Sequence, residues 1–142
     1  MPAILPIEED ADMYAVRYYS RSGNTKILAE AIARAAGTEA VSVDAGNAAI
    51  VEPVDVLFVG GALYAYGLDK HLKNWLSELD SAKVKKAVVF STSWISKHSL
   101  DLIRSALQAK GIDVASESIY AKNKPTAEDI KAAETIVKKV IS

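Results

Sequence analysis

The chain has 142 residues, half of them hydrophobic and a quarter charged, which is typical of a single globular domain. Its 17 basic and 18 acidic residues nearly cancel, so the chain carries no positive field that would attract nucleic acid or an anionic membrane surface. The absence of cysteine excludes disulfides, thiolate metal sites and thiol nucleophiles, so any redox chemistry must come from a bound cofactor.

The first twelve residues, 1–12, are interpreted as an N-terminal arm. They contain no basic n-region and are interrupted by Pro2 and Pro6, which argues against a secretory signal. No apolar run in the chain approaches the roughly 18 residues that a membrane-spanning helix needs. We therefore expect a cytoplasmic protein with no membrane span and no nucleic-acid partner.

The first half of the domain predicts a strand, a helix and a second strand. Tyr14–Tyr19 is rich in β-branched and aromatic residues, which favours a strand. From Asn24 onward apolar residues recur at helical spacing, and Gly37 follows where a helix would end. Residues 40–44 predict a short strand. Residues 45–53 are weakly patterned and predict a loop with room for one helical turn.

The next segment contains two apolar runs on either side of an amphipathic helix. Residues 54–59 form a nearly continuous apolar run, closed by Gly60 and Gly61, which is typical of a strand buried on both faces. Apolar residues between 68 and 79 then define a helix, in which Trp75 is expected to face the core. Residues 87–90 predict the next buried strand.

The C-terminal part predicts a helix, a strand and a last helix. Apolar residues from Leu100 onward line one helix face, and Gly111 ends the pattern. Residues 112–121 predict a fifth strand. Thr126, followed three residues later by Asp129, is the pattern of a capped helix start.

Strands that alternate with helices predict an α/β domain of three layers with a parallel sheet. Because crossovers between parallel strands are right-handed, few windings remain, and five strands in so short a chain favour the order 2-1-3-4-5. In that order a ligand crevice opens beside the first and third strands. We expect residues 1–142 to form one such domain.

The segment Ser20-Arg-Ser-Gly-Asn-Thr-Lys26 lies between the first strand and the first helix. Three hydroxyls there surround the open amides of a helix N-terminus, which together can bind a phosphate group. Gly23 allows the backbone to curve around an anion without a Cβ. An ordinary capping loop is the alternative, because serine and asparagine often cap helices.

Three other phosphate-site patterns do not fit this segment. A dinucleotide fingerprint needs three spaced glycines, and a P-loop needs a second glycine followed by lysine. Only Gly23 is present here. A receiver domain would need acidic residues at the end of the first strand, where Tyr18, Tyr19 and Ser20 stand instead.

Tyr19-Ser-Arg-Ser-Gly-Asn-Thr25 resembles the flavodoxin signature, in which a hydroxyl-rich S-x-[ST]-G-N-T loop holds the phosphate of flavin mononucleotide (FMN). The resemblance extends from Tyr14 to the end of the chain and includes the length of a short-chain flavodoxin. The segment from Gly60 to Gly67 is also similar to its counterpart in bacterial flavodoxin-like protoporphyrinogen oxidases. The resemblance implies a flavodoxin-like three-layer sandwich with FMN as its cofactor.

The resemblance also implies which residues bind the cofactor. The phosphate would be held by the loop after the first strand, and the flavin ring by two loops with aromatic side chains that exclude water. These residues are Ser20, Arg21, Ser22, Gly23, Asn24 and Thr25 for the phosphate, and Ala62, Leu63, Tyr64, Ala65, Tyr66, Gly67, Ser91, Thr92, Ser93 and Trp94 for the ring.

The basic residues near the phosphate loop have two possible roles. Arg21 and Lys26 are close enough in sequence to supply a countercharge, or else they face solvent. His71 and His98 are single histidines without a constellation of carboxylates, so we expect no metal site and no catalytic side chain.

Two functions follow from the resemblance. The first is an FMN-binding protein of electron transfer, whose partners are a reductase and an acceptor protein. The alternative is a small FMN-dependent oxidoreductase that acts on a quinone, a porphyrinogen or a similar flat substrate.

Overall fold

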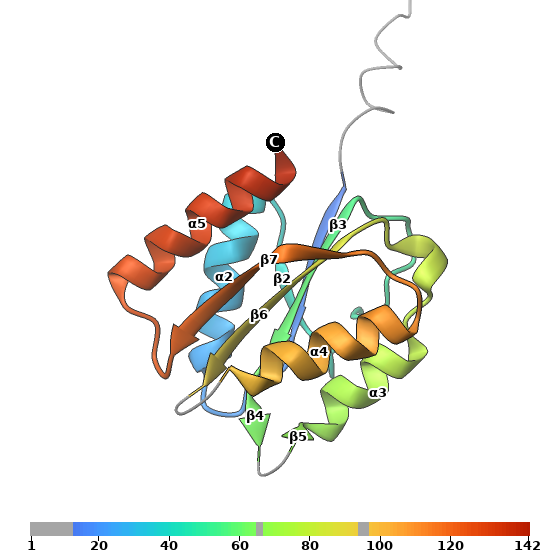
Figure 1. Cartoon of the computed structure of the whole chain (residues 1–142), viewed down its shortest axis with the longest axis horizontal. Helices are drawn as coiled ribbons and strands as arrows, with labels where there is room; N and C mark the ends of the chain where they lie inside the picture. Colours follow the sequence, from blue (N-terminus) through green and yellow to red (C-terminus); the bar gives the residue numbers. More distant parts are fainter. Residues whose placement is uncertain (1–12, 65–66, 94–96) are drawn as a thin grey trace, which may run out of the picture.

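The computed structural model describes residues 13–64, 67–93 and 97–142. Its centre is a five-stranded parallel sheet in the order β2-β1-β3-β6-β7 (Figure 1). Numbered along this sheet alone, the order is 2-1-3-4-5, so the predicted winding is confirmed. The strands are β1 (Tyr14–Tyr18), β2 (Ala40–Ser42), β3 (Val56–Gly61), β6 (Ala87–Ser93) and β7 (Val114–Lys122).

In the part of the chain that the structure describes, four α-helices cover the two faces of the sheet, and all four were predicted (Figure 1). Helices α2 and α5 pack on one face, and helices α3 and α4 pack on the other. Their bounds are α2 (Asn24–Ala36), α3 (Lys70–Glu78), α4 (His98–Ala109) and α5 (Ala127–Ile141).

The central strands are apolar on both faces because helices cover both. All six residues of β3 are buried, and their side chains divide between two separate cores. Phe58 packs toward α2 and α5, whereas Leu57 and Val59 pack toward α3 and α4. This explains why the strand reads as a continuous apolar run instead of an alternating one.

The predicted ends of two helices are confirmed. Gly37 follows α2 with a φ of 76°, a left-handed conformation that glycine adopts without steric cost. At the start of α5, the Asp129 N–H donates to the Thr126 hydroxyl over 3.1 Å, and the Thr126 N–H donates to the Asp129 carboxylate over 2.9 Å. This reciprocal pair is the capping box that the sequence predicted.

Several details differ from the prediction. Residues 45–53 contain turns and bends, and the helical turn that the sequence allowed there is absent. Helix α3 begins at Lys70, later than expected, because Leu68 belongs to a small antiparallel hairpin of β4 (Leu63–Tyr64) and β5 (Gly67–Leu68). The short 3-10 helix η1 (Ser81–Lys83) was also not predicted.

Two further expectations concern burial and the membrane. Trp75 is 9% exposed, and its indole N–H donates to the Ala48 carbonyl over 3.1 Å, which confirms that it belongs to the core. In the described ranges, every helix is too short or too polar to cross a bilayer.

Candidate cofactor-binding site

The candidate site lies at the carboxyl ends of β1 and β3, where the strand order reverses. The chain leaves β1 toward one face of the sheet and leaves β3 toward the other, as α2 and α3 on opposite faces show (Figure 1). Diverging connections of this kind leave an open crevice in doubly wound sheets. The predicted phosphate loop stands at this crevice, because it directly follows β1.

The loop between β1 and α2 is held in shape by its own hydroxyls. The Gly23 N–H donates to the Ser20 hydroxyl oxygen over 2.9 Å, and the Asn24 N–H donates to the Ser22 hydroxyl oxygen over 3.3 Å. Each serine oxygen acts as the acceptor in these bonds, so each serine keeps its own hydroxyl hydrogen for another acceptor. Gly23 has a φ of 95°, which most other residues adopt only with strain.

The start of α2 fits a phosphate group. The N–H groups of Thr25 and Lys26 find no acceptor among the described residues, and no side chain of those residues caps the helix. The first turn contains no acidic residue. A Cβ built on Gly23 would meet nothing within 4 Å. Open amides, hydroxyl groups and the positive end of the helix dipole therefore lie together at the start of α2.

Thr25 plays a different part from the two serines. It is 1% exposed, and its hydroxyl lies 2.6 Å from the hydroxyl of Thr92. Thr92 belongs to β6, the strand next to β3 in the sheet. The pair uses one hydroxyl hydrogen for this bond and keeps a second one. The bond fixes the start of α2 against the end of β6.

The structure extends β6 to Ser93, so the first three residues of the predicted second ring loop belong to this strand, and two of them, Ser91 and Thr92, are buried. The Ser91 hydroxyl donates to the Gly61 carbonyl over 2.6 Å, which ties the end of β6 to the end of β3. The Tyr120 hydroxyl donates to the Ser93 carbonyl over 2.9 Å. These bonds fix the backbone of residues 91–93 at the edge of the crevice.

Asn123, the residue after β7, joins the phosphate loop to the end of β6. Its side-chain oxygen accepts a hydrogen bond from the Asn24 amide over 3.2 Å, and its own N–H donates to the Ser93 carbonyl over 3.1 Å. Its φ of 61° is in the left-handed region, where asparagine is more common than most residues. The phosphate loop is thus connected to the last strand of the sheet.

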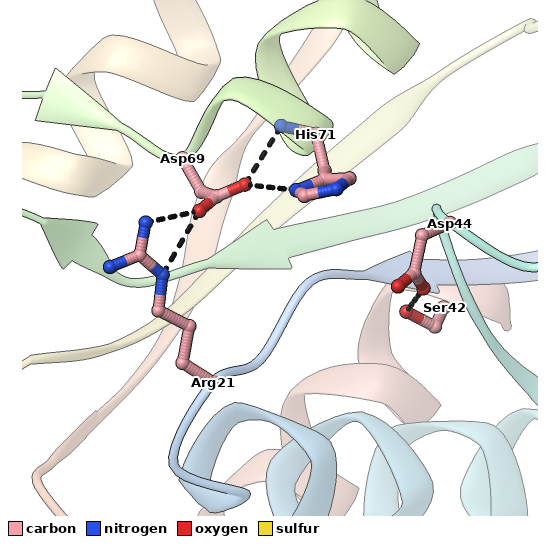
Figure 2. A network of polar contacts seen from close by, with 5 residues as sticks. All are labelled: Arg21, Ser42, Asp44, Asp69 and His71. Carbon is pink, nitrogen blue, oxygen red and sulfur yellow. Dashed lines mark hydrogen bonds and ion pairs between the residues drawn. The ribbon is translucent and has the colours of Figure 1, made fainter.

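Asp69 connects the phosphate loop with helix α3 (Figure 2). Its side chain is 3% exposed, and one carboxylate oxygen accepts from Arg21 Nε over 3.0 Å and from the terminal guanidinium nitrogen over 2.6 Å. The other oxygen accepts from the His71 backbone N–H over 2.7 Å and lies 2.8 Å from His71 Nδ1. The His71 ring in turn stacks on Tyr19, with ring centres 4.7 Å apart.

The surroundings of Asp69 keep it ionised. Burial alone would raise the pKa of the Asp69 carboxyl, but the hydrogen bonds from the His71 N–H, from Arg21 and from the His71 ring, with the charge of Arg21, hold that pKa below its usual value. The Arg21 guanidinium is therefore paired with Asp69, and its role as a countercharge for a phosphate remains a prediction. Lys26 is exposed.

We expect the Asp69→Asn variant to unfold at pH 7 with a free energy about 1–2 kcal/mol lower than that of the parent chain, because the bonds to a charged acceptor become weaker. The folded pKa is below the unfolded value of about 3.9, so this contribution is complete above about pH 4 and is lost as pH falls through the folded pKa. Urea unfolding between pH 2 and pH 7 measures the difference.

Asp113→Asn is the control, since Asp113 is exposed. It should change the unfolding free energy by less than about 0.5 kcal/mol. A difference for Asp69→Asn that stays constant down to pH 2 would show that the loss comes from packing and not from the ionised carboxylate.

The structure brings most predicted site residues to one edge of the sheet. Ser20–Thr25, Ala62, Gly67 and Ser91–Ser93 all lie at or beside the carboxyl ends of β1, β3 and β6. For Leu63 and Tyr64 only the backbone, in strand β4, is described. Ala65, Tyr66 and Trp94 lie outside the described residues, and the cofactor contacts of all the predicted site residues remain predictions.

Four residues at this edge were not predicted as site residues. They are Tyr19, Asp69, His71 and Asn123. Asp69 could have been suspected from the sequence as an aspartate that caps an amphipathic helix. Nothing in the sequence pairs it with Arg21, which is 48 residues away.

Comparisons with known proteins agree with this fold. A family model described as flavodoxin domain matches residues 15–136. A flavodoxin from the domain Archaea is 23% identical, with a TM-score of 0.77 over 91% of this chain and 99% of that one. Flavodoxin 1 from Bacillus cereus is 20% identical, with a TM-score of 0.71 over 90% and 97% of the two chains.

A larger protein contains a similar unit. Rubredoxin oxygen:oxidoreductase from Desulfovibrio gigas is 16% identical, with a TM-score of 0.75, and the match covers 94% of this chain but 37% of that one. These structural likenesses show a common fold. No curated protein sequence matches the chain significantly.

Proposed function

The chain belongs to the flavodoxin family, and from this premise we propose that it binds FMN and carries electrons from a reductase to an acceptor protein. FMN is the cofactor of this family. The cofactor supplies the redox chemistry, since it accepts electrons singly or in pairs. No side chain of the protein then needs to act as an acid, a base or a nucleophile.

The main support for the proposal is the N-terminus of α2, where backbone N–H groups have no acceptor among the described residues. The Thr25 and Lys26 N–H groups find no acceptor among the described residues, the hydroxyls of Ser20 and Ser22 lie in the same loop, and the first turn of α2 has no acidic residue. A phosphate dianion is the ligand that best satisfies such donors. In this proposal the loop binds the phosphate of FMN.

The remaining predicted residues would orient the ring and exclude water from it. The β4–β5 hairpin and the segment that begins with Ser91–Ser93 stand at the same edge of the sheet as the phosphate loop. Hydrogen bonds from Ser91 and Tyr120 fix the second segment, and the bond between Arg21 and Asp69 fixes the first one relative to the phosphate loop. A rigid site of this kind lowers the entropy lost on binding.

The proposal is tested by comparing FMN with riboflavin, which has the same ring but no phosphate. We expect the purified protein to bind FMN and to bind riboflavin at least about 100-fold more weakly, because riboflavin leaves the open amides without an acceptor. Quenching of flavin fluorescence measures both dissociation constants. Equal affinities would exclude the loop as a phosphate site.

A second measurement distinguishes the carrier from the alternative enzyme. The FMN-loaded protein is mixed with NAD(P)H and a quinone, with and without a flavodoxin reductase. A carrier needs the reductase for rapid reduction, whereas rapid turnover without it would favour the small oxidoreductase. The cytoplasmic location stays a prediction, which fractionation of the native cells would check.

A further inference from the structure

A groove lies between α3 and α4, next to the β4–β5 hairpin. It has a volume of about 520 Å³. Its walls are mainly apolar, and two lysines stand among them. The lining residues used below are Leu68, Leu76, Leu102, Ala106, Lys73 and Lys110.

The two helices leave this groove open because small or half-buried side chains face each other across it. Leu102 and Ala106 are one helical turn apart on α4, and both are half-buried. The far end is closed by Lys110, whose ammonium group donates to the Ser77 carbonyl over 2.9 Å. The near end opens at Gly67 of the hairpin, where a built Cβ would lie 3.7 Å from the Lys73 ammonium nitrogen.

The groove is positively charged as well as apolar. Lys110 contacts a neutral carbonyl, and Lys73 has no hydrogen bond or ion pair to the residues that the structure describes. None of the described residues that line the groove is acidic. An occupant that combines an apolar side chain with carboxylates would therefore complement it in both respects.

The groove adjoins the candidate cofactor site. Gly67 and Leu68 form strand β5, and the next residue, Asp69, caps α3 and holds Arg21 of the phosphate loop. A protein that docks in the groove would therefore contact the hairpin that the proposed function assigns to the flavin ring. Electron transfer between proteins uses small and transient contacts, which suits a single groove of this size.

We propose that this groove is the docking site for an acidic redox partner protein, which inserts an apolar side chain flanked by carboxylates. The proposal rests on the electron-transfer function proposed above. The apolar side chain would fill the space between Leu76, Leu102 and Ala106. The carboxylates would pair with Lys73 and Lys110, so that the interaction weakens as the salt concentration rises.

The test uses the FMN-loaded, ¹⁵N-labelled protein and three blocked hexapeptides. The first peptide is Glu-Glu-Leu-Phe-Glu-Glu, the second has lysines in place of the glutamates, and the third has Gly-Gly in place of Leu-Phe. We expect only the first peptide to shift the amide signals of Gly67, Leu102 and Ala106. Lys73→Glu should weaken its binding about fivefold to tenfold.

Lys131→Glu is the matched control, because Lys131 is exposed on α5, on the opposite face of the sheet, and the variant has the same change in net charge. It should alter the affinity by less than about twofold. Unchanged groove signals with the first peptide, or equal effects of the two variants, would overturn the docking site. Equal binding of the first and third peptides would overturn the apolar part of the proposal.

A kinetic experiment tests whether the groove takes part in electron transfer. The rate at which the reduced protein reduces cytochrome b5, an acidic haem protein, should fall about fivefold in Lys73→Glu at low salt and stay unchanged in Lys131→Glu. Peptide binding without this effect would overturn the assignment to a redox partner. Absorbance of bound FMN is measured for each sample, so failure of cofactor binding is seen separately from failure of docking.

Discussion

Replacing Asn24 with aspartate should weaken FMN binding about 100-fold, equivalent to about 2.7 kcal/mol. Asn24 is the first residue of α2 and stands beside the open amides that are proposed to bind the phosphate. A carboxylate at this position repels a phosphate dianion and competes with it for the same N–H donors. Quenching of flavin fluorescence measures the dissociation constants of the variant and the parent. The ratio between them should become smaller as salt is added, because salt screens the repulsion.

The fold itself should tolerate this substitution. A negative charge at a helix N-terminus is favourable for the helix dipole, so the cofactor-free variant should be at least as stable as the parent chain. The bond to Asn123 can persist, because the Asn123 amide can rotate and donate its N–H to the new carboxylate. Loss of cofactor without loss of stability would thus isolate the charge effect.

Asn74→Asp is the matched control for this prediction. Asn74 is an exposed residue of α3, and the substitution makes the same change in charge away from the phosphate loop. Its FMN affinity should stay within about twofold of the parent value. If Asn24→Asp also kept the parent affinity, the phosphate would have to bind elsewhere.

Replacing Gly60 with alanine should lower the unfolding free energy by about 3 kcal/mol and the melting temperature by roughly 10 °C. Gly60 in β3 pairs with Phe90 in β6. A Cβ at Gly60 would lie 2.4 Å from both the carbonyl oxygen and the Cδ2 atom of Phe90. The ring could move only within a packed core, and the carbonyl belongs to a strand that cannot shift alone.

Gly46→Ala provides the control for the stability measurement. A Cβ at Gly46, in the turns after β2, would meet nothing within 4 Å. This variant should be neutral or more stable by up to about 1 kcal/mol, because alanine reduces the freedom of the unfolded chain. Scanning calorimetry compares the two variants, and a Gly60→Ala protein as stable as the parent would contradict the packing argument.

Local patterns in the sequence were sufficient for most of the fold. Apolar periodicity predicted five strands and four helices, and the capping pair Thr126 and Asp129 predicted the start of α5. The β4–β5 hairpin was missed because two-residue strands are too short to show a period. The same limit explains why the start of α3 was placed too early.

In the candidate site too, the sequence predicted the local interactions but not the long-range ones. Its hydroxyl-rich loop was evident from neighbouring residues, since the bonds of Gly23 to Ser20 and of Asn24 to Ser22 span three and two positions. The pairing of Thr25 with Thr92 spans 67 positions, and that of Asn24 with Asn123 spans 99. No periodicity connects residues so far apart.

The order of strands and the presence of a hydroxyl-rich loop before α2 were thus determined by the sequence alone, because both arise from interactions between near neighbours and from the right-handed crossover. The tertiary structure alone decided that Arg21 is paired with Asp69, that Phe90 leaves no room for a side chain at Gly60, and that α3 and α4 leave a groove with free positive charge. Each of these depends on which side chains meet after the strands and helices have packed. Packing brings together residues from distant parts of the chain, and their separation in the sequence does not reveal it.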